Sequence, residues 1–233
     1  MTLFHNFHRL CLSGFLAIAV LSAISLYSSD PLQDLYIKHC NTRSDINEHI
    51  SILHDLAKEC ASVTEIGIMD VVSTWGCLQG LSESPYGPRS YVGIDISSPP
   101  QSKLLLAERL AKKKGISFRF ICANDMNIEI EPSDMLFIDS LHTYCHLTYE
   151  LEKFSPKIHK FIAMHDTSDP WGSCDDSAYR GDYSEYPASF NRNQKGLWAA
   201  VEDFLANHSE WRLLERRVNN HGLTILERIE DNP

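Results

Sequence analysis

The sequence predicts an α/β protein with a doubly wound, mostly parallel seven-stranded sheet, and three observations favour this. Five short apolar runs, each typical of a buried strand, alternate with segments whose apolar residues recur at helical spacing. Several of these runs end in glycine or aspartate, as parallel strands often do beside a ligand. Two runs of period two, residues 211–216 and 223–228, then predict an antiparallel hairpin at the C-terminal end of the sheet.

Composition limits the class of protein and the kind of partner. The 233 residues are 43% hydrophobic, which is enough for one packed domain. The net charge of −10 excludes nucleic-acid backbone as the main partner, because phosphate binding needs a basic face. The seven cysteines include no CxxC pair, so neither a structural zinc site nor a disulfide scaffold is indicated. We therefore expect a small molecule as the partner.

The N-terminal segment differs from the rest of the chain. Residues 10–27 carry no charge, and this length lies between the core of a signal peptide and a membrane span. Both alternatives stay open, so residues 1–29 are predicted to be a signal peptide or a membrane anchor and residues 30–233 the globular domain. Arg9 on one side and Lys38 on the other do not decide the orientation. The expected location is membrane-anchored or secreted.

Apolar periodicity and the residues that end helices and strands predict the remaining elements. Strands are predicted over residues 63–67, 91–95, 116–122, 134–139 and 158–164, and helices over 32–40, 45–60, 71–81, 103–114, 143–154 and 196–207. Ser44 is a good N-cap for the second helix. His49 and His54 lie off the apolar stripe of that helix, and we expect them to be solvated.

Residues 63–95 form the stretch around which the rest is organised. Gly67 ends the first strand, and Asp95 ends the second, at a spacing that suits one strand–helix–strand unit. A carboxylate at the tip of the second strand typically accepts hydrogen bonds from ribose hydroxyls. No further glycine follows closely, so a diphosphate has no cradle, whereas a nucleoside such as S-adenosylmethionine needs none. Alternatively, Glu65 and Asp95 are strand-end acids that face water.

The third strand is followed by Asn124 and Asp125. A polar side chain at this tip can pair with an adenine amine. The same two residues are also typical of a plain Asx turn, and the sequence does not separate these alternatives.

The chemical centre is predicted where the fourth and fifth strands end. Asp139 and His142 follow the fourth strand, and His165 and Asp166 follow the fifth. Carboxyl ends of parallel strands meet at one edge of the sheet, so these side chains should converge. Two carboxylates beside imidazoles can hold a divalent cation such as Mg²⁺, and they can equally supply a general base for a hydroxyl.

Residues 168–195 contain no clear element and are rich in acids and aromatic side chains. A connection of this length inside a compact domain is usually functional. We expect a lid or an acceptor pocket that includes Trp171, Tyr179, Tyr183 and Tyr186. The alternative is a disordered insertion.

Four segments, VTEIG, YVGID, DMLFIDSLHTY and FIAMHDT, resemble the class I S-adenosylmethionine-dependent methyltransferases. Within them they are similar to the branch that includes macrocin O-methyltransferase and the cephalosporin hydroxylase-like proteins. The resemblance covers residues 44–229 and implies the Rossmann-like methyltransferase fold. It also implies a divalent cation that orients an acceptor hydroxyl.

The resemblance also implies roles for individual residues. Glu65 and Gly67 fall on the first cofactor motif, Asp95 on the ribose-binding acid, and Asn124 with Asp125 on the adenine-side loop. Asp139 falls on a metal-ligand aspartate, and His165 with Asp166 on the acidic pair after the fifth strand. Imidazole suits softer metals than Mg²⁺, so His165 is either a metal ligand or the base.

Two functions are consistent with these patterns. The first is O-methylation of a small-molecule or glycosidic hydroxyl, with Asp139, His142 and His165 as catalytic residues and Asp139, His165 and Asp166 as metal ligands. The second is a membrane-tethered, non-catalytic module of the same fold that binds a partner through residues 168–195. An α/β hydrolase is disfavoured because no GxSxG elbow is present.

Overall fold

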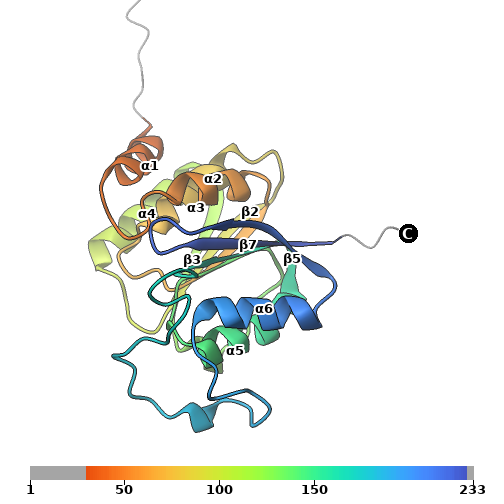
Figure 1. Cartoon of the computed structure of the whole chain (residues 1–233). Helices are drawn as coiled ribbons and strands as arrows, with labels where there is room; N and C mark the ends of the chain where they lie inside the picture. The colour runs from red at the N-terminus through yellow and green to blue at the C-terminus, as the bar shows by residue number, and fades with distance from the viewer. Residues whose placement is uncertain (1–29, 230–233) are drawn as a thin grey trace, which may run out of the picture. The chain divides into compact units, whose positions relative to one another are not determined.

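The computed structural model describes residues 30–229, and of these residues 31–229 belong to one compact unit. A seven-stranded sheet in the order β3-β2-β1-β4-β5-β7-β6 forms its centre (Figure 1). The strands are β1 (Ser62–Ile66), β2 (Arg89–Asp95), β3 (Ile116–Cys122), β4 (Ser133–Ile138), β5 (Ile158–His165), β6 (Trp211–Arg217) and β7 (Leu223–Arg228). The first five are parallel, and β7 pairs antiparallel with both β5 and β6. The predicted doubly wound sheet with a C-terminal hairpin is confirmed.

Helices cover both faces of this sheet. The described helices are α1 (Pro31–Asn41), α2 (Ile50–Lys58), α3 (Ser73–Glu83), α4 (Gln101–Lys113), α5 (Tyr144–Phe154) and α6 (Leu197–Asn207). The first four lie on one side and α5 and α6 on the other (Figure 1). Leu53, Leu78 and Leu110 belong to the core on the α2–α4 side, and Leu151 and Phe204 to the core on the α5–α6 side. Strands buried between two such layers are apolar throughout, which is why their sequence runs are continuous.

The strand order reverses direction between β1 and β4. From β1 the chain adds β2 and then β3 on one side, and after β3 it returns to the other side of β1 to form β4. Ligands in open α/β sheets bind beyond the carboxyl ends of the strands at such a reversal. The strand order therefore predicts a ligand site at the carboxyl ends of β1, β2 and β4.

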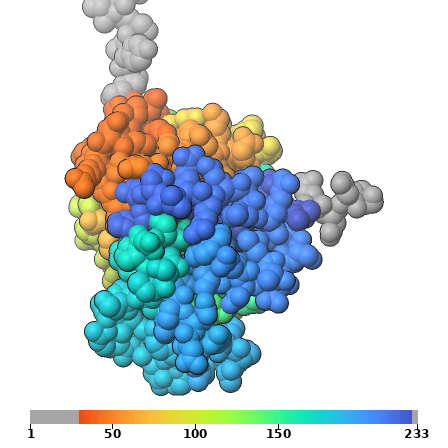
Figure 2. Space-filling view, in the orientation of Figure 1, coloured from red at the N-terminus to blue at the C-terminus, as the bar shows by residue number. Residues whose placement is uncertain are grey.

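The turn of the β6–β7 hairpin lies against the start of α2 and the end of β5. Asn220 accepts a hydrogen bond from the Glu48 amide (3.1 Å) and donates one to the Ser44 carbonyl (3.0 Å). The Ser168 amide donates to the His221 carbonyl (2.8 Å). Asn220 and His221 adopt positive φ values of 49° and 66°, which a tight turn demands. Figure 2 shows this blue segment between the orange N-terminal helices and the teal stretch after β5.

Three predictions about α2 and the residues before it are wrong. The helix begins at Ile50 rather than at residue 45, because residues 45–49 form a separate turn. His49, predicted to be solvated, is fully buried with its Nε2 3.0 Å from the Asn219 carbonyl oxygen. His54, also predicted to be solvated, is 9% exposed because Tyr36 of α1 stacks on its ring.

The predicted membrane or signal segment, residues 10–27, and the whole of residues 1–29 lie outside the described residues. Among residues 30–229, no helix combines the length and apolar character that crossing a membrane requires. The six described cysteines are free thiols, in agreement with the predicted lack of a disulfide scaffold.

Candidate active site

A cavity of about 510 Å³ opens at the carboxyl ends of the central strands, and we call it the strand-tip cavity. Its lining comes from the ends of β1, β2, β3 and β4, from α5 and from the long connection after β5. The lining residues are Ile66, Gly67, Met69, Ile94, Asp95, Ile96, Ser97, Ala123, Asn124, Asp125, Met126, Asp139, Ser140, Leu141, His146, Tyr179, Glu185 and Tyr186. The cavity therefore lies where the strand order predicts a ligand site.

Gly67 allows three strand ends to meet at the floor of this cavity. Its φ of +86° is in the region that favours glycine, and a Cβ there would lie 1.9 Å from the Asp139 carbonyl oxygen. The Gly67 amide donates to the Ile94 carbonyl (2.8 Å), and the Asp139 amide donates to the Ile66 carbonyl (2.9 Å). Any side chain at Gly67 would push β1 and β4 apart just where the cavity begins.

Asp95 lines the cavity and also orders its rim. Its Oδ2 accepts a hydrogen bond from the Met69 amide (2.9 Å), and its Oδ1 accepts from the Ser97 amide (2.9 Å). A carboxylate has about four acceptor sites, so this aspartate keeps capacity for a ligand hydroxyl. The predicted placement of Asp95 beside a nucleoside-sized cavity agrees with the geometry.

Asn124 and Asp125 lie together on the opposite wall. The Asn124 side chain accepts from the Met126 amide (2.9 Å), which is the predicted Asx turn, and the residue also lines the cavity. The Asx turn is thus present, and the contact of Asn124 with an adenine stays a prediction. The Asp125 carboxylate is 9% exposed and lies 3.0 Å from His146 Nε2, a neighbour that the sequence did not indicate.

Glu65 is placed away from the cavity, which does not support its predicted role in cofactor binding. Its fully buried carboxyl accepts hydrogen bonds from Ser73, Thr74 and Tyr91. Burial raises the pKa of Glu65 to about 7, although the three hydroxyl donors oppose that rise. Side chains alternate along a strand, so Glu65 faces α3 and β2 and holds them rather than a ligand.

The four predicted residues at the ends of β4 and β5 converge, and we call them the strand-tip cluster: Asp139, His142, His165 and Asp166. His142 Nε2 lies 2.9 Å from Asp166 Oδ2 and 3.8 Å from Asp139 Oδ1. His165 Nδ1 lies 3.3 Å and 3.5 Å from the same two oxygens. Asp139 also lines the cavity, so the cluster adjoins it directly.

Burial makes the electrostatics of the strand-tip cluster strong. The His165 side chain is 1% exposed and that of Asp166 is 6% exposed. Burial alone would lower the pKa of both imidazoles, but the two carboxylates raise it to about 9 for His142 and about 10 for His165. The same contacts hold the pKa of Asp139 and Asp166 below the usual range although burial acts to raise it. Two imidazolium and two carboxylate groups thus balance each other.

The surroundings fix the orientation of both imidazoles. His165 Nε2 must donate to the Asn220 carbonyl oxygen (3.1 Å), which turns Nδ1 toward the carboxylates. His49 meets the His165 ring edge to face, with ring centres 5.6 Å apart. Trp171 packs on the His142 ring at 4.6 Å. His165 Nδ1 and Asp166 Oδ1 are buried without a hydrogen bond to any described residue, so the cluster keeps unused ligand atoms.

The strand-tip cluster offers ligand atoms for a divalent cation. Asp139, His142 and Asp166 each offer a ligand atom, and these atoms lie within 4.8 Å of one another. A cation of charge +2 would replace the two imidazolium protons with no change in net charge. The sequence predicted His165 rather than His142 as the third metal ligand, whereas the geometry groups His142 with Asp139 and Asp166. Since imidazole is present, the donor set suits a softer cation than Mg²⁺.

Residues 168–195 cover one end of the cavity. Asp175 ties this connection to the start of α5 and to the residue before α6, because its Oδ1 accepts from the amides of Tyr144 (2.8 Å) and Gly196 (3.0 Å). Tyr179 and Tyr186 reach the cavity wall. Trp171 and Tyr183 of the predicted lid do not line the cavity, so the role of this segment as a lid or acceptor pocket stays a prediction. Asp175 itself had no signal in the sequence.

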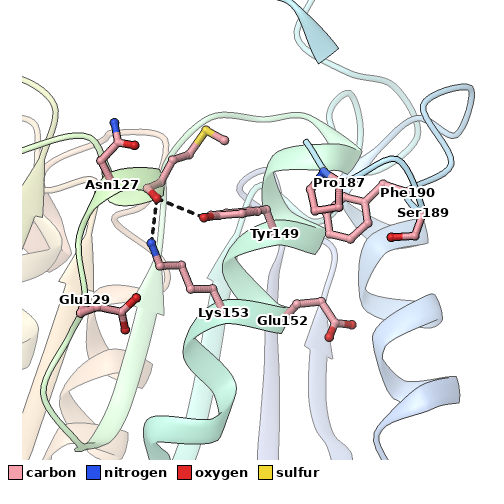
Figure 3. A pocket seen from close by; sticks show the side chains of 9 residues that line it. Asn127, Glu129, Tyr149, Glu152, Lys153, Pro187, Ser189 and Phe190 are labelled. Atoms are coloured by element: carbon pink, nitrogen blue, oxygen red, sulfur yellow. Dashed lines mark hydrogen bonds between the residues drawn. The ribbon is translucent and has the colours of Figure 1, made fainter. Parts of the chain in front are cut away.

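A second hollow lies on the far side of Met126 and is more open (Figure 3). Lys153 and Tyr149 of α5 both point at the Met126 carbonyl oxygen and donate to it at 2.8 Å and 3.0 Å. Glu129, Glu152 and Phe190 form its sides. These bonds support the wall of the strand-tip cavity from behind, because Met126 lines both hollows.

Solved structures share this fold. A protein from Corynebacterium glutamicum aligns with a TM-score of 0.54 and 15% identity over 94% of this chain and 98% of its own. The O-methyltransferase TomG from Streptomyces achromogenes, solved in complex with SAM, gives 0.53 and 14% over 91% and 95%. An O-methyltransferase from Bacillus cereus in complex with SAH gives 0.51 and 13% over 91% and 97%. No protein-family profile and no curated protein sequence matches this chain. The fold is the Rossmann-like methyltransferase fold.

Proposed function

We propose that this protein is an S-adenosylmethionine-dependent O-methyltransferase that acts on a small-molecule or glycosidic hydroxyl. One observation carries the proposal: Asp139 belongs both to a nucleoside-sized cavity and to a buried cluster of acids and imidazoles. Donor and catalytic groups are thereby brought side by side. The solved O-methyltransferases of the same fold support this assignment.

The donor fits the cavity by its chemistry. Asp95 would accept hydrogen bonds from the ribose hydroxyls, and Asn124 with Asp125 would face the adenine. The glycine at 67 lets the backbone approach the nucleoside closely. A sulfonium then lies next to Asp139, whose negative charge attracts it.

Methyl transfer needs alignment more than covalent chemistry. The acceptor oxygen bonds to the methyl carbon as the carbon–sulfur bond breaks and its electron pair goes to sulfur. The hydroxyl proton has to leave, and the Asp139 carboxylate in the cavity lining can take it, with the His142 imidazolium beside that carboxylate. A divalent cation held by Asp139, His142 and Asp166, with His165 beside them, would lower the pKa of that hydroxyl.

The acceptor class follows from charge and from the resemblance to the macrocin branch. The net charge of −10 and the acids around the site disfavour nucleic acid. The aromatic side chains of Trp171, Tyr179 and Tyr186 suit a sugar ring or an aromatic ring at the entrance. We therefore propose a small hydroxylated acceptor.

The test is transfer of a labelled methyl group from S-adenosylmethionine to a panel of glycosides and phenols. We expect turnover by the purified full chain and a loss of about 10²- to 10⁴-fold in Asp139→Asn. Turnover should also fall on treatment with a chelator. If the chain binds the donor but methylates no hydroxyl in the panel, the catalytic assignment is wrong and a binding module is favoured.

A further inference from the structure

A second group of acids and imidazole lies in the wall of the strand-tip cavity, which Asp125 and His146 line, and we call it the buried triad: Asp125, His146 and Glu150. Asp125 follows β3 in the short 3₁₀ helix Asp125–Asn127, whereas His146 and Glu150 lie one turn apart on α5. Exposure is 9% for Asp125, 5% for His146 and 0% for Glu150. The strand-tip cluster has no residue in common with it.

The distances within the buried triad match those of ligands around one metal ion. His146 Nε2 lies 3.0 Å from Asp125 Oδ2 and 3.8 Å from Glu150 Oε1. One ligand atom from each of the three residues lies within 4.8 Å of the others. Ligands about 2.1 Å from a zinc-like ion at tetrahedral angles are about 3.4 Å apart, which falls between the two measured values.

Hydrogen bonds alone do not explain this arrangement. Neither Asp125 Oδ2 nor Glu150 Oε2 has a hydrogen-bond partner among the described residues, although both are buried. His146 Nε2 is close to Asp125 Oδ2, but the pair does not form a hydrogen bond of normal geometry. Buried carboxylate oxygens are seldom left unpaired, so these atoms point to a ligand that they share.

The next shell of side chains orients the three residues. Tyr186 Oη lies 3.0 Å from His146 Nδ1, and the Ser140 hydroxyl donates to Glu150 Oε1 (2.7 Å). A metal-binding imidazole almost always has such a partner on its other nitrogen. The nearby Lys153 does not neutralise the carboxylates, because its ammonium group donates to the carbonyls of Asp125 and Met126.

We propose that Asp125, His146 and Glu150 bind a divalent transition-metal ion of the Zn²⁺ or Mn²⁺ type. Imidazole with two carboxylates suits these ions. Mg²⁺ keeps several waters and Ca²⁺ needs six to eight oxygens, and a site this buried supplies neither. The ion would tie the loop after β3 to α5 and, through Tyr186, to residues 168–195.

Carboxylate and imidazole groups bind a metal ion only in their deprotonated forms, so metal binding at the buried triad should weaken as the pH falls.

The test uses Co²⁺ as the probe, because its visible absorption reports nitrogen and oxygen ligation. Equilibrium dialysis of the full chain gives the number of ions bound, and Zn²⁺ should displace them whereas Mg²⁺ should not. Glu150→Gln and His146→Gln should each lose one equivalent relative to the unmodified chain. Asp166→Asn, which alters the strand-tip cluster, should keep that equivalent. Tyr186→Phe should bind roughly 10- to 100-fold more weakly, as is typical for loss of an outer partner.

Circular dichroism serves as the folding control for each variant. If Glu150→Gln does not fold, Asp125→Asn must lose the same equivalent. The proposal is overturned if the unmodified chain binds no Co²⁺, or if the triad variants keep every ion. It is equally overturned if Asp166→Asn loses all bound Co²⁺, because the ion would then lie at the strand-tip cluster alone.

Discussion

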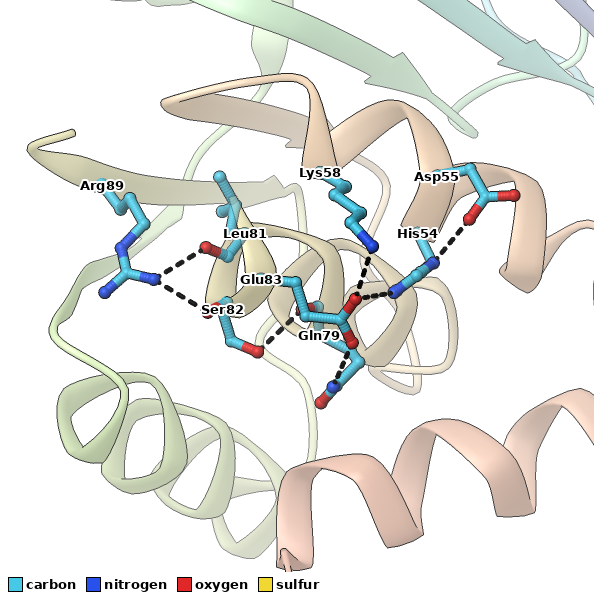
Figure 4. Close-up of polar contacts among 8 residues, drawn as sticks. All are labelled: His54, Asp55, Lys58, Gln79, Leu81, Ser82, Glu83 and Arg89. Atoms are coloured by element: carbon cyan, nitrogen blue, oxygen red, sulfur yellow. Dashed lines mark hydrogen bonds and ion pairs between the residues drawn. The ribbon is translucent and has the colours of Figure 1, made fainter. Parts of the chain in front are cut away.

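The molecule contains two networks of the same residue types in opposite settings. The strand-tip cluster, residues 139, 142, 165 and 166, is buried at the carboxyl end of the sheet. The second, which we call the α2–α3 network, joins two helices at the surface (Figure 4). There, His54 Nδ1 lies 2.8 Å from Asp55, and Glu83 lies 3.1 Å from Lys58 and 3.3 Å from His54 Nε2.

The difference between the networks indicates which of them does chemistry. Side-chain exposure is 46% for Lys58 and 36% for Glu83, so water solvates these charges and their pairing adds little stability. In the strand-tip cluster, Asp166 is 6% exposed and has an oxygen without a hydrogen bond. Unpaired buried atoms do not separate the networks, because His54 Nε2 and Gln79 Oε1 also lack a hydrogen bond. The strand-tip cluster differs in that all its acids and imidazoles have side-chain exposures of 1–23% and lie beside a cavity, and such sites are usually functional.

The sharpest test of this comparison pairs Asp166→Asn with Glu83→Gln. We expect methyl transfer to fall by about 10²- to 10⁴-fold in Asp166→Asn, because the amide neither holds a cation nor orients His142. Binding of S-adenosylhomocysteine should change little, since Asp166 does not line the cavity. Glu83→Gln should leave both quantities unchanged. Equal losses in the two variants would remove the distinction between the networks.

A second test concerns the floor of the strand-tip cavity and uses Gly67→Ala and Gly115→Ala. Both glycines have positive φ, but a Cβ at Gly67 would strike the Asp139 backbone at 1.9 Å, whereas at Gly115 its nearest contact is 3.5 Å away. We expect Gly115→Ala to cost about 1 kcal/mol of unfolding free energy from backbone strain alone. Gly67→Ala should cost several-fold more and abolish donor binding. Urea denaturation measures both, and similar losses would show that the close approach is unimportant.

The pH dependence of stability should differ in sign between the networks. The pKa of His142 is raised to about 9 and that of His165 to about 10, so their contribution is complete below pH 6.5 and is lost as the pH rises through 9 to 10. In Glu83, burial is outweighed by Gln79, Lys58 and His54, which lower the pKa to about 2. Its contribution is present above pH 4.5 and is lost as the pH falls through 2.

Denaturation curves of the chelator-treated protein check these signs. Asp166→Asn should flatten the alkaline decline by an amount on the order of 3 kcal/mol at most. Glu83→Gln should flatten only the acid side. An alkaline decline that is the same in Asp166→Asn and in the unmodified chain would contradict the assigned coupling.

The smallest expected effect is the stability change in Glu83→Gln at neutral pH. Exposed ion pairs typically contribute about 0–1 kcal/mol, so the unfolding free energy should fall by no more than that. Thermal denaturation at low and high salt measures it, and salt should reduce the difference further. A loss of several kcal/mol would mean that the α2–α3 network carries more of the fold than its exposure suggests.

Local sequence patterns predicted the sheet and the strand-tip cluster well, for a physical reason. Buried parallel strands are continuous apolar runs, and their carboxyl ends meet at one edge, so Asp139 and Asp166 could be brought together without coordinates. Gly67 and Asp95 were predicted by the same argument. These predictions depend only on the strand order and on the edge of the sheet at which the strands end.

The predictions that the structure does not support depend on contacts distant in sequence or on the direction of a side chain. His49 is buried because Asn219, 170 residues away, accepts from its ring. The carboxyl of Glu65 accepts from the hydroxyls of Ser73, Thr74 and Tyr91, and these side-chain contacts direct it away from the cavity. His146 and Glu150 were not predicted as site residues, because only the position of Asp125 shows what their face of α5 meets.

The central claim is that the strand tips hold a sulfonium nucleoside beside an activated hydroxyl. Isothermal titration of the full chain with S-adenosylhomocysteine tests it most directly. We predict one site per chain, with affinity about 10- to 100-fold weaker in Asp95→Ala because hydrogen bonds from ribose to a charged acceptor are lost. Glu83→Gln should bind as the unmodified chain does. No binding, or equal binding by Asp95→Ala, would contradict the account.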